Sequence, residues 1–158
     1  LDIHGEVLGP RHERTAQNLR VLGDIERALG RPDSAHARYV RALGIVRETR
    51  GPKHQEVATL RLREAQILDR RGDDVAAEAA YRDAVAIYTA AVGDGHFLTV
   101  DASLYLLEFL AARGRDAEAA ALAAELDPAV DSLDARFPAL RERLEAVRGR
   151  GTGGQVGA

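Results

Sequence analysis

The segment Gly9-Pro10-Arg11-His12 returns in this sequence as Gly51-Pro52-Lys53-His54 and again, less completely, as Gly93-Asp94-Gly95-His96. The copies follow one another at a constant 42-residue interval. A second set of glycines keeps the same interval, at Gly30, Gly72 and Gly114. A fixed period of this length indicates a stack of similar structural units. The sequence therefore predicts a repeat protein.

Each repeat is expected to hold two helices separated by these markers. The first helices are predicted at about 13–29, 55–71 and 97–113, and the second at about 33–49, 74–92 and 116–126. Apolar residues follow helical spacing in the second helix of the first repeat, at Ala35, Tyr39, Ala42, Leu43 and Val46. We predict an all-α fold with no strand and more than about 75% helix, against about a third in ordinary globular chains.

The two ends of the chain depart from this plan. Asp127-Pro128 is predicted to end the last paired helix, because proline lacks the N–H that continues a helix. A short helical piece is expected over 129–137, and then a capping helix over 138–148. Its apolar residues, predicted to cover the open end of the stack, are Ala139, Leu140, Leu144 and Val147. The Gly-rich residues 149–158 are predicted to be a flexible tail.

Residues 1–8 align with residues 43–50 at the 42-residue step, which places Leu1 and Ile3 at the positions of Leu43 and Ile45. We therefore interpret residues 1–9 as the end of a preceding repeat, and the sequence as a piece of a longer chain. The first residue is not methionine, so the absence of a leader peptide carries no information.

The composition excludes several classes of function. The formal net charge of the 158 residues is −3, which gives nucleic acid no broad basic surface. No apolar run reaches the roughly 18 residues of a membrane span. The chain has no cysteine, which rules out disulfides and thiolate chemistry and fits a reducing compartment. We expect one cytoplasmic domain that binds neither nucleic acid nor membrane.

The histidines of the repeated loop do not indicate a metal site. His12, His54 and His96 hold the same position in successive repeats and should lie about 10 Å or more apart. Ligands of one ion must lie within about 2.1 Å of it, so we predict a loop-packing role instead. No serine or threonine stands in a strained turn beside a base. We expect no metal, no cofactor, no catalytic residue and no enzyme activity.

The residues at fixed repeat positions resemble the tetratricopeptide repeat (TPR) family, in its 42-residue, kinesin-light-chain-like variety. The matching residues are Leu19, Leu22, Gly23, Gly30, Ala35, Tyr39 and Ala42; Ala65, Gly72, Ala77, Tyr81 and Ala84; and Leu106, Gly114 and Ala119. The resemblance implies a right-handed α-solenoid of about three helix pairs within a domain over 1–148. Its repeats are 10–51, 52–93 and 94–128, followed by the cap over 129–148.

The resemblance also implies a protein–protein interaction scaffold. In this family the first helices line a concave groove, which holds a segment of a partner or of the parent chain. The groove residues predicted here are Arg20, Val21, Asp24, Arg27, Leu62, Arg63, Gln66, Tyr105 and Glu108. Arg20, Arg63 and Tyr105 are the expected anchors. The asparagines that often hold peptides in the family are missing from this groove.

Two further interpretations stay open. The array resembles those appended to bacterial signalling kinases and nucleotide-dependent regulators, so it is alternatively a structural or regulatory arm with no ligand of its own. Arg61 and Glu64 stand three residues apart and can pair on one helix face. This pair is either a surface ion pair or a polar contact with a partner or a neighbouring layer. In the first case the helix packs through Leu60, Ala65, Ile67 and Leu68.

Overall fold

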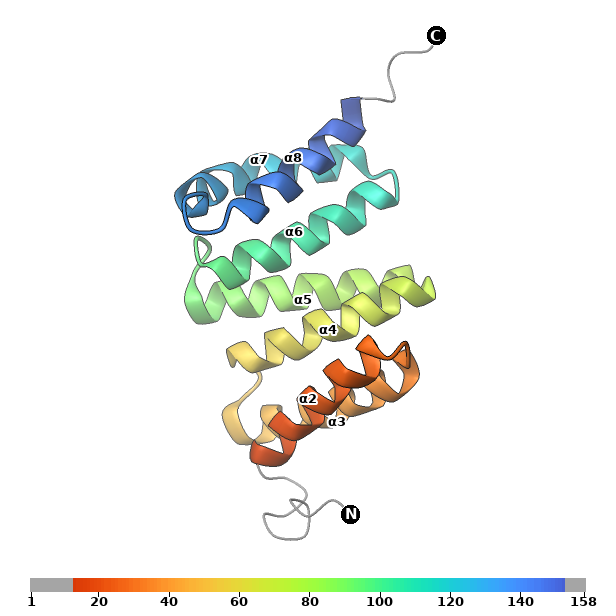
Figure 1. Ribbon diagram of the computed structural model, residues 1–158. Coiled ribbons are helices and arrows are strands. Elements are labelled where there is room, and N and C mark those ends of the chain that lie inside the picture. The colour runs from red at the N-terminus through yellow and green to blue at the C-terminus, as the bar shows by residue number, and fades with distance from the viewer. Residues whose placement is uncertain (1–12, 153–158) are drawn as a thin grey trace. The chain divides into compact units, whose positions relative to one another are not determined.

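A computed structural model describes residues 13–152 of the chain and the side chains of residues 13–149. The described residues form seven helices and no strand (Figure 1). Helices make up 85% of these residues, so the predicted all-α class and helix content are confirmed.

The helices begin and end close to the predicted bounds. They are α2 (Glu13–Ala28), α3 (Pro32–Arg50), α4 (Gln55–Arg71), α5 (Asp74–Val92), α6 (Phe97–Ala112), α7 (Asp116–Leu133) and α8 (Pro138–Thr152). For α2 to α6 both ends lie within one residue of the prediction. The reason is local, because glycine and proline mark the turns. Gly72, for example, ends α4 in the left-handed conformation (φ +76°) that glycine adopts without strain.

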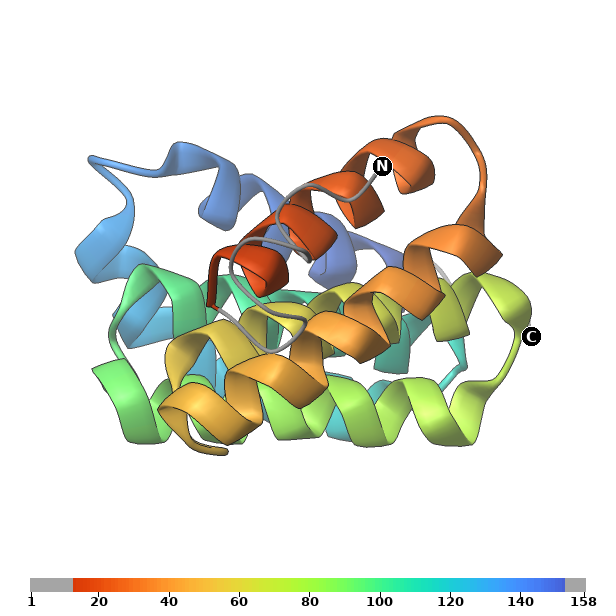
Figure 2. The same cartoon turned by 90° about the horizontal axis from the view of Figure 1, so that it is seen from below.

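The chain divides into two compact units, and the boundary lies inside α5, between Ile87 and Tyr88. Unit one contains α2, α3, α4 and the first part of α5. A tight turn joins α2 to α3, which run in opposite directions (Figure 2), and α3 packs against α4. A cluster of buried apolar residues in this unit comprises Ala16, Leu19, Ala35, Tyr39, Ala42, Leu43, Ile45, Val46, Val57, Leu60 and Ile67. The predicted apolar stripe of α3 therefore belongs to the core of unit one.

A small residue on the first helix faces a tyrosine on the second helix of the first hairpin. A Cβ atom built at Gly23 of α2 would lie 2.5 Å from Cε1 of Tyr39, closer than van der Waals contact allows. In unit two, Leu107 and Ala123 hold the equivalent positions and are both buried. The large and small residues have exchanged helices there, so a similar volume is filled from the other side.

Unit two contains the end of α5 together with α6, α7 and α8. The last helix, α8, packs against both α6 and α7. Leu140, Leu144 and Val147 of α8 are buried, as the predicted cap requires, whereas Ala139 is exposed and does not contribute. In the loop before α8, the Phe137 ring lies 4.3 Å from that of Phe97, the first residue of α6.

The prediction that Asp127-Pro128 ends the helix is wrong, because α7 continues through Pro128 to Leu133. Proline removes one helical hydrogen bond. Burial of Leu126 and Val130 on either side of Pro128 offsets this loss, and both residues continue the apolar stripe that begins at Ala119. Tertiary packing therefore outweighs a local helix-breaking signal.

The last helix is also longer than predicted. It runs to Thr152, so residues 149–152, predicted to belong to a flexible tail, are helical. The remaining tail (153–158), His12 and the predicted end of a preceding repeat (1–9) lie outside the described residues.

Candidate functional site

Two of the repeated histidines cap helices. Nδ1 of His54 accepts a hydrogen bond of 3.2 Å from the backbone N–H of Glu56 at the start of α4. His96 does the same for the N–H of Leu98 at the start of α6, also at 3.2 Å. Each ring satisfies a backbone donor that the first turn of a helix leaves without a partner. The role is structural and repeats with the 42-residue period.

Replacing His54 by alanine is expected to lower the free energy of unfolding by about 1 kcal/mol, the usual scale for a lost N-cap. Urea denaturation followed by far-UV circular dichroism measures this change. His54→Asn, which keeps a short acceptor at the cap position, should restore most of the loss. Equal destabilisation by both substitutions would contradict a capping role.

In unit one, side chains from three helices contact the carboxylate of Asp24 on α2. Nη1 of Arg20, also on α2, donates to Oδ2 at 3.2 Å. Nε of Arg63 on α4 lies 3.4 Å from Oδ1, and the hydroxyl of Tyr39 on α3 donates to the same oxygen at 2.8 Å. The predicted anchors Arg20 and Arg63 therefore lie on one face, which we call the unit-one polar surface (Arg20, Asp24 and Arg63).

The tyrosine beneath this surface is part of the core. Only 1% of Tyr39 is exposed, and its hydroxyl reaches the surface through the bond to Asp24. Burial is the largest of three effects that raise the pKa of Tyr39 to about 12. The hydrogen bond to Asp24 and the negative charge of Asp24 add to it. The hydroxyl of the buried, neutral tyrosine thus holds Asp24 in place, and the two arginines contact the same carboxylate. Their side chains remain 34% and 32% exposed and can reach an outside group.

The other predicted groove residues of unit one differ in accessibility. Val21 is exposed and Arg27 is half-buried, whereas Leu62 and Gln66 are buried. Oε1 of Gln66 accepts a hydrogen bond of 3.3 Å from Nη1 of Arg63 and so helps to orient that guanidinium. Leu62 packs into the unit and offers little surface. Contact of these residues with a partner stays a prediction.

The predicted pairing of Arg61 with Glu64 is confirmed, at 2.7 Å. The pair is not isolated on α4. Arg61 also lies 3.2 Å from Asp83 of α5, and Glu64 lies 3.6 Å from Nε2 of His36 of α3. It therefore links α4 to the helices on either side. Leu60, Ala65 and Ile67 of α4 are buried as expected, whereas Leu68 is only half-buried.

In unit two, Arg143 of α8 covers the predicted anchor Tyr105 of α6. The centre of its guanidinium lies 4.2 Å from the centre of the Tyr105 ring, a cation–π contact. Its Nε and Nη2 atoms donate to the two oxygens of Glu108 at 2.7 and 3.0 Å. Its Nη1 donates to Asp101 at 2.6 Å. The residues predicted to bind a partner here already hold a side chain of the same chain.

Electrostatics favour this arrangement. Burial opposes the charge of Arg143, but the hydrogen bonds and charges of Glu108 and Asp101 outweigh burial and raise the pKa of Arg143. Arg143 follows Asp101 at the 42-residue interval and so holds the same repeat position. The sequence shows the opposite charges of these two residues, but the 42-residue interval alone does not determine that their side chains meet.

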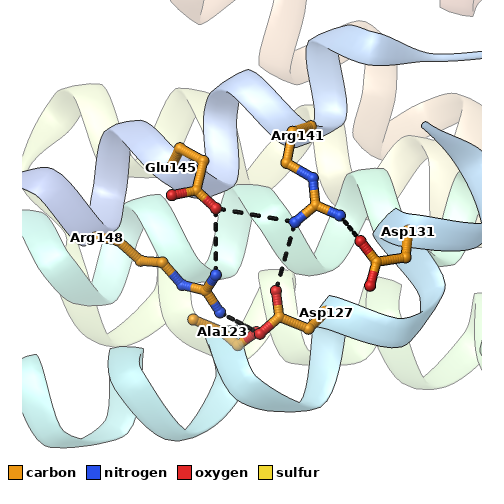
Figure 3. Close-up of polar contacts among 6 residues, drawn as sticks. All are labelled: Ala123, Asp127, Asp131, Arg141, Glu145 and Arg148. Carbon is orange, nitrogen blue, oxygen red and sulfur yellow. Dashed lines mark hydrogen bonds and ion pairs between the residues drawn. The ribbon is translucent and has the colours of Figure 1, made fainter. Parts of the chain in front are cut away.

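Two further arginines fasten α8 to α7 (Figure 3). Arg148 binds Asp127 and donates to the carbonyl oxygen of Ala123 at 3.4 Å, and Arg141 binds Asp131. The hydrogen bond from Arg148 lowers the pKa of Asp127. Asp127 belongs to the dipeptide that was expected to end α7, so the continued helix is what places it beside α8.

Metal sites and membrane-spanning helices were also sought in the described part of the chain, and neither was found. Residues 13–152 contain no group of three or more histidine or acidic side chains that could hold a metal ion. None of the helices within these residues is long and apolar enough to cross a membrane.

Comparison with known proteins supports the repeat class. The family model described as tetratricopeptide repeat matches residues 1–48, a segment that includes α2 and most of α3. No curated protein matches the sequence. The family match supports a TPR protein, a class that implies protein–protein interaction, and agrees with the packing of adjacent helices.

Proposed function

We propose that this chain is a protein-interaction scaffold that binds a segment of a partner protein on the unit-one polar surface. The observation that carries this proposal is the convergence of Arg20 and Arg63 on Asp24. Two guanidiniums from neighbouring first helices approach one carboxylate while a third of each side chain stays accessible. The TPR match over residues 1–48, which includes α2, gives independent support.

The chemistry of the surface indicates which segment it takes. Asp24 occupies the place that a carboxylate of a ligand would take between the two arginines, so it serves as an internal substitute for that ligand. Arginine binds carboxylates through paired hydrogen bonds and is frequent among the residues that dominate binding energy. We therefore expect the partner segment to be extended and to present an aspartate, a glutamate or a terminal carboxylate.

Substitutions on either side of this contact should act in opposite directions. Arg63→Ala is expected to weaken binding of the acidic segment by about 2 kcal/mol, the scale of an interface hot spot. Asp24→Asn should strengthen it by about 1 kcal/mol, since a negative charge that competes with the ligand carboxylate for the two arginines is removed. Titration calorimetry measures both effects, after the partner has been captured with the intact chain.

The controls separate binding from folding. Asparagine keeps an oxygen that accepts the Tyr39 hydroxyl, so Asp24→Asn should leave the core intact. Arg82→Ala removes another partly exposed arginine of unit one, which pairs with Glu78 on α5, and should not alter affinity. If Arg82→Ala abolishes binding while Arg63→Ala has no effect, the unit-one polar surface is not the site.

A second function is favoured by the occupied surface of unit two. Arg143 fills the space over Tyr105 and Glu108, which suits a structural or regulatory arm of a larger signalling protein that binds nothing there. This alternative predicts that Arg63→Ala and Asp24→Asn alter no binding of any kind. It predicts instead a change in the activity of an attached domain when the helices are destabilised.

A further inference from the structure

Helices α2 and α3 of unit one line a hollow of about 320 Å³. Its lining comprises Leu19 of α2 and Ser34, Ala37, Arg38 and Arg41 of α3. The four α3 residues follow one another at intervals of three, one and three residues, so they share one face of that helix. A volume of this size lies at the lower end of the range for small-molecule sites. We call this feature the α2–α3 hollow.

The polar part of the lining suits an anion. Nη2 of Arg38 donates to Oε1 of Glu26 on α2 at 3.2 Å, and this ion pair restricts the guanidinium while 35% of the side chain stays exposed. Arg31 lies 3.7 Å from the other oxygen of Glu26, so two arginines compensate one carboxylate. Arg41 and Ser34 are exposed. Ser34 also stands in the first turn of α3, where the positive end of the helix dipole favours negative charge.

The same place in the second repeat holds an acidic group. One repeat after Leu19 and Arg41 stand Arg61 of α4 and Asp83 of α5, whose side chains lie 3.2 Å apart. The charges of Arg61 and Asp83 therefore neutralise one another across the two helices. The first repeat has an apolar residue and a cation at these two positions, and the other two polar residues of the hollow are both alanine one repeat later. The hollow is thus specific to the first repeat, and an anion would complete its charge balance.

We propose that the α2–α3 hollow binds a phosphate monoester, with the phosphate held by Arg38, Arg41 and the hydroxyl of Ser34. Guanidinium groups present paired N–H donors that match phosphate oxygens, and the hydroxyl adds another donor. A phosphate monoester carries nearly two negative charges at pH 7, which matches two guanidiniums better than a single carboxylate does. The apolar part of the lining contacts the carbon atoms next to the ester oxygen. The hollow shares no residue with the unit-one polar surface, so binding there is independent of the proposed function.

Titration of the intact chain with two small esters tests this site. N-acetyl-O-phosphoserine amide represents a phosphorylated side chain and glycerol 3-phosphate represents a small metabolite, so the tighter of the two identifies the source of the phosphate. Shifts of backbone amide signals in two-dimensional NMR spectra, recorded at low ionic strength to limit screening, should centre on Ser34 and Ala37. Two charged hydrogen bonds correspond to a dissociation constant of about 1 mM. The absence of such shifts with both esters overturns the proposal, and inorganic phosphate that binds as tightly as the esters overturns the assignment to an ester.

Matched variants of α3 show whether the phosphate lies in the hollow. Arg41→Gln is expected to weaken binding at least about tenfold, because one charged hydrogen bond is lost. The control is Arg47→Gln, an exposed arginine of the same helix outside the hollow, which should change the affinity by less than about twofold.

A second substitution repeats the test at the hydroxyl. Ser34→Ala should weaken binding about threefold, as for one neutral hydrogen bond. Far-UV circular dichroism checks that all three variants keep the helical fold. If Arg41→Gln and Arg47→Gln weaken binding equally, the ester responds only to the general positive charge of α3 and the α2–α3 hollow is not its site.

Discussion

Replacing Leu144 by alanine is expected to lower the free energy of unfolding of unit two by about 2–5 kcal/mol, the range for a buried leucine. Leu144 of α8 is fully buried, and Leu140 and Val147 on the same helix are buried as well. The substitution removes apolar contact and leaves a cavity where α8 meets α6 and α7. Urea denaturation followed by far-UV circular dichroism measures the loss, and near-UV dichroism of the tyrosines reports tertiary packing.

The matched control for this substitution lies on the same helix. Glu142 is exposed on α8, so Glu142→Ala should change stability by no more than about 0.5 kcal/mol, as usual for surface positions. A loss below about 1 kcal/mol for Leu144→Ala would show that α8 is not docked through this residue.

Gly23→Ala is expected to destabilise unit one by about 1–3 kcal/mol, the typical penalty of overpacking a core. An added Cβ would lie 2.5 Å from Cε1 of Tyr39, and that ring is buried and bonded through its hydroxyl to Asp24. The ring cannot move aside without losing this bond. Thermal unfolding measured by circular dichroism reports the change.

The same substitution at Gly44 should have the opposite sign. Gly44 lies inside α3, and a Cβ there would meet no atom within 4 Å. Alanine is favoured over glycine inside a helix by about 0.5–1 kcal/mol, so Gly44→Ala should stabilise the protein. If both substitutions stabilise it, the close contact between Gly23 and Tyr39 is not present in solution.

The occupied surface of unit two changes how Tyr105 should be tested. An exposed groove aromatic can be truncated with little effect on stability. Tyr105 instead supports Arg143, which also holds Glu108 and Asp101. Tyr105→Ala therefore disturbs the packing of α8 on α6. Loss of binding in that variant would not identify a contact with a partner. Arg63 of unit one is the cleaner probe of the proposed function.

The sequence alone determined the repeat, the class of fold and most helix bounds. Glycine and proline set the turns, and apolar spacing set the buried faces, as in Ala35 and Tyr39 of α3. These signals lie within about one helical turn of the residues they affect. The turn residues and the apolar spacing recur with the 42-residue period, so each repeat predicts the same pair of helices independently.

Only the tertiary structure decided how charged side chains meet. Arg20 and Arg63 were predicted to share a face, but their convergence on Asp24 depends on how α2 and α4 pack. The sequence placed Tyr105 in an open groove, whereas α8 brings Arg143 onto it. Arginine is long and flexible, so spacing along the chain does not determine which acidic group it reaches. The same holds for Pro128, because packing around α7 outweighed the local preference to end the helix.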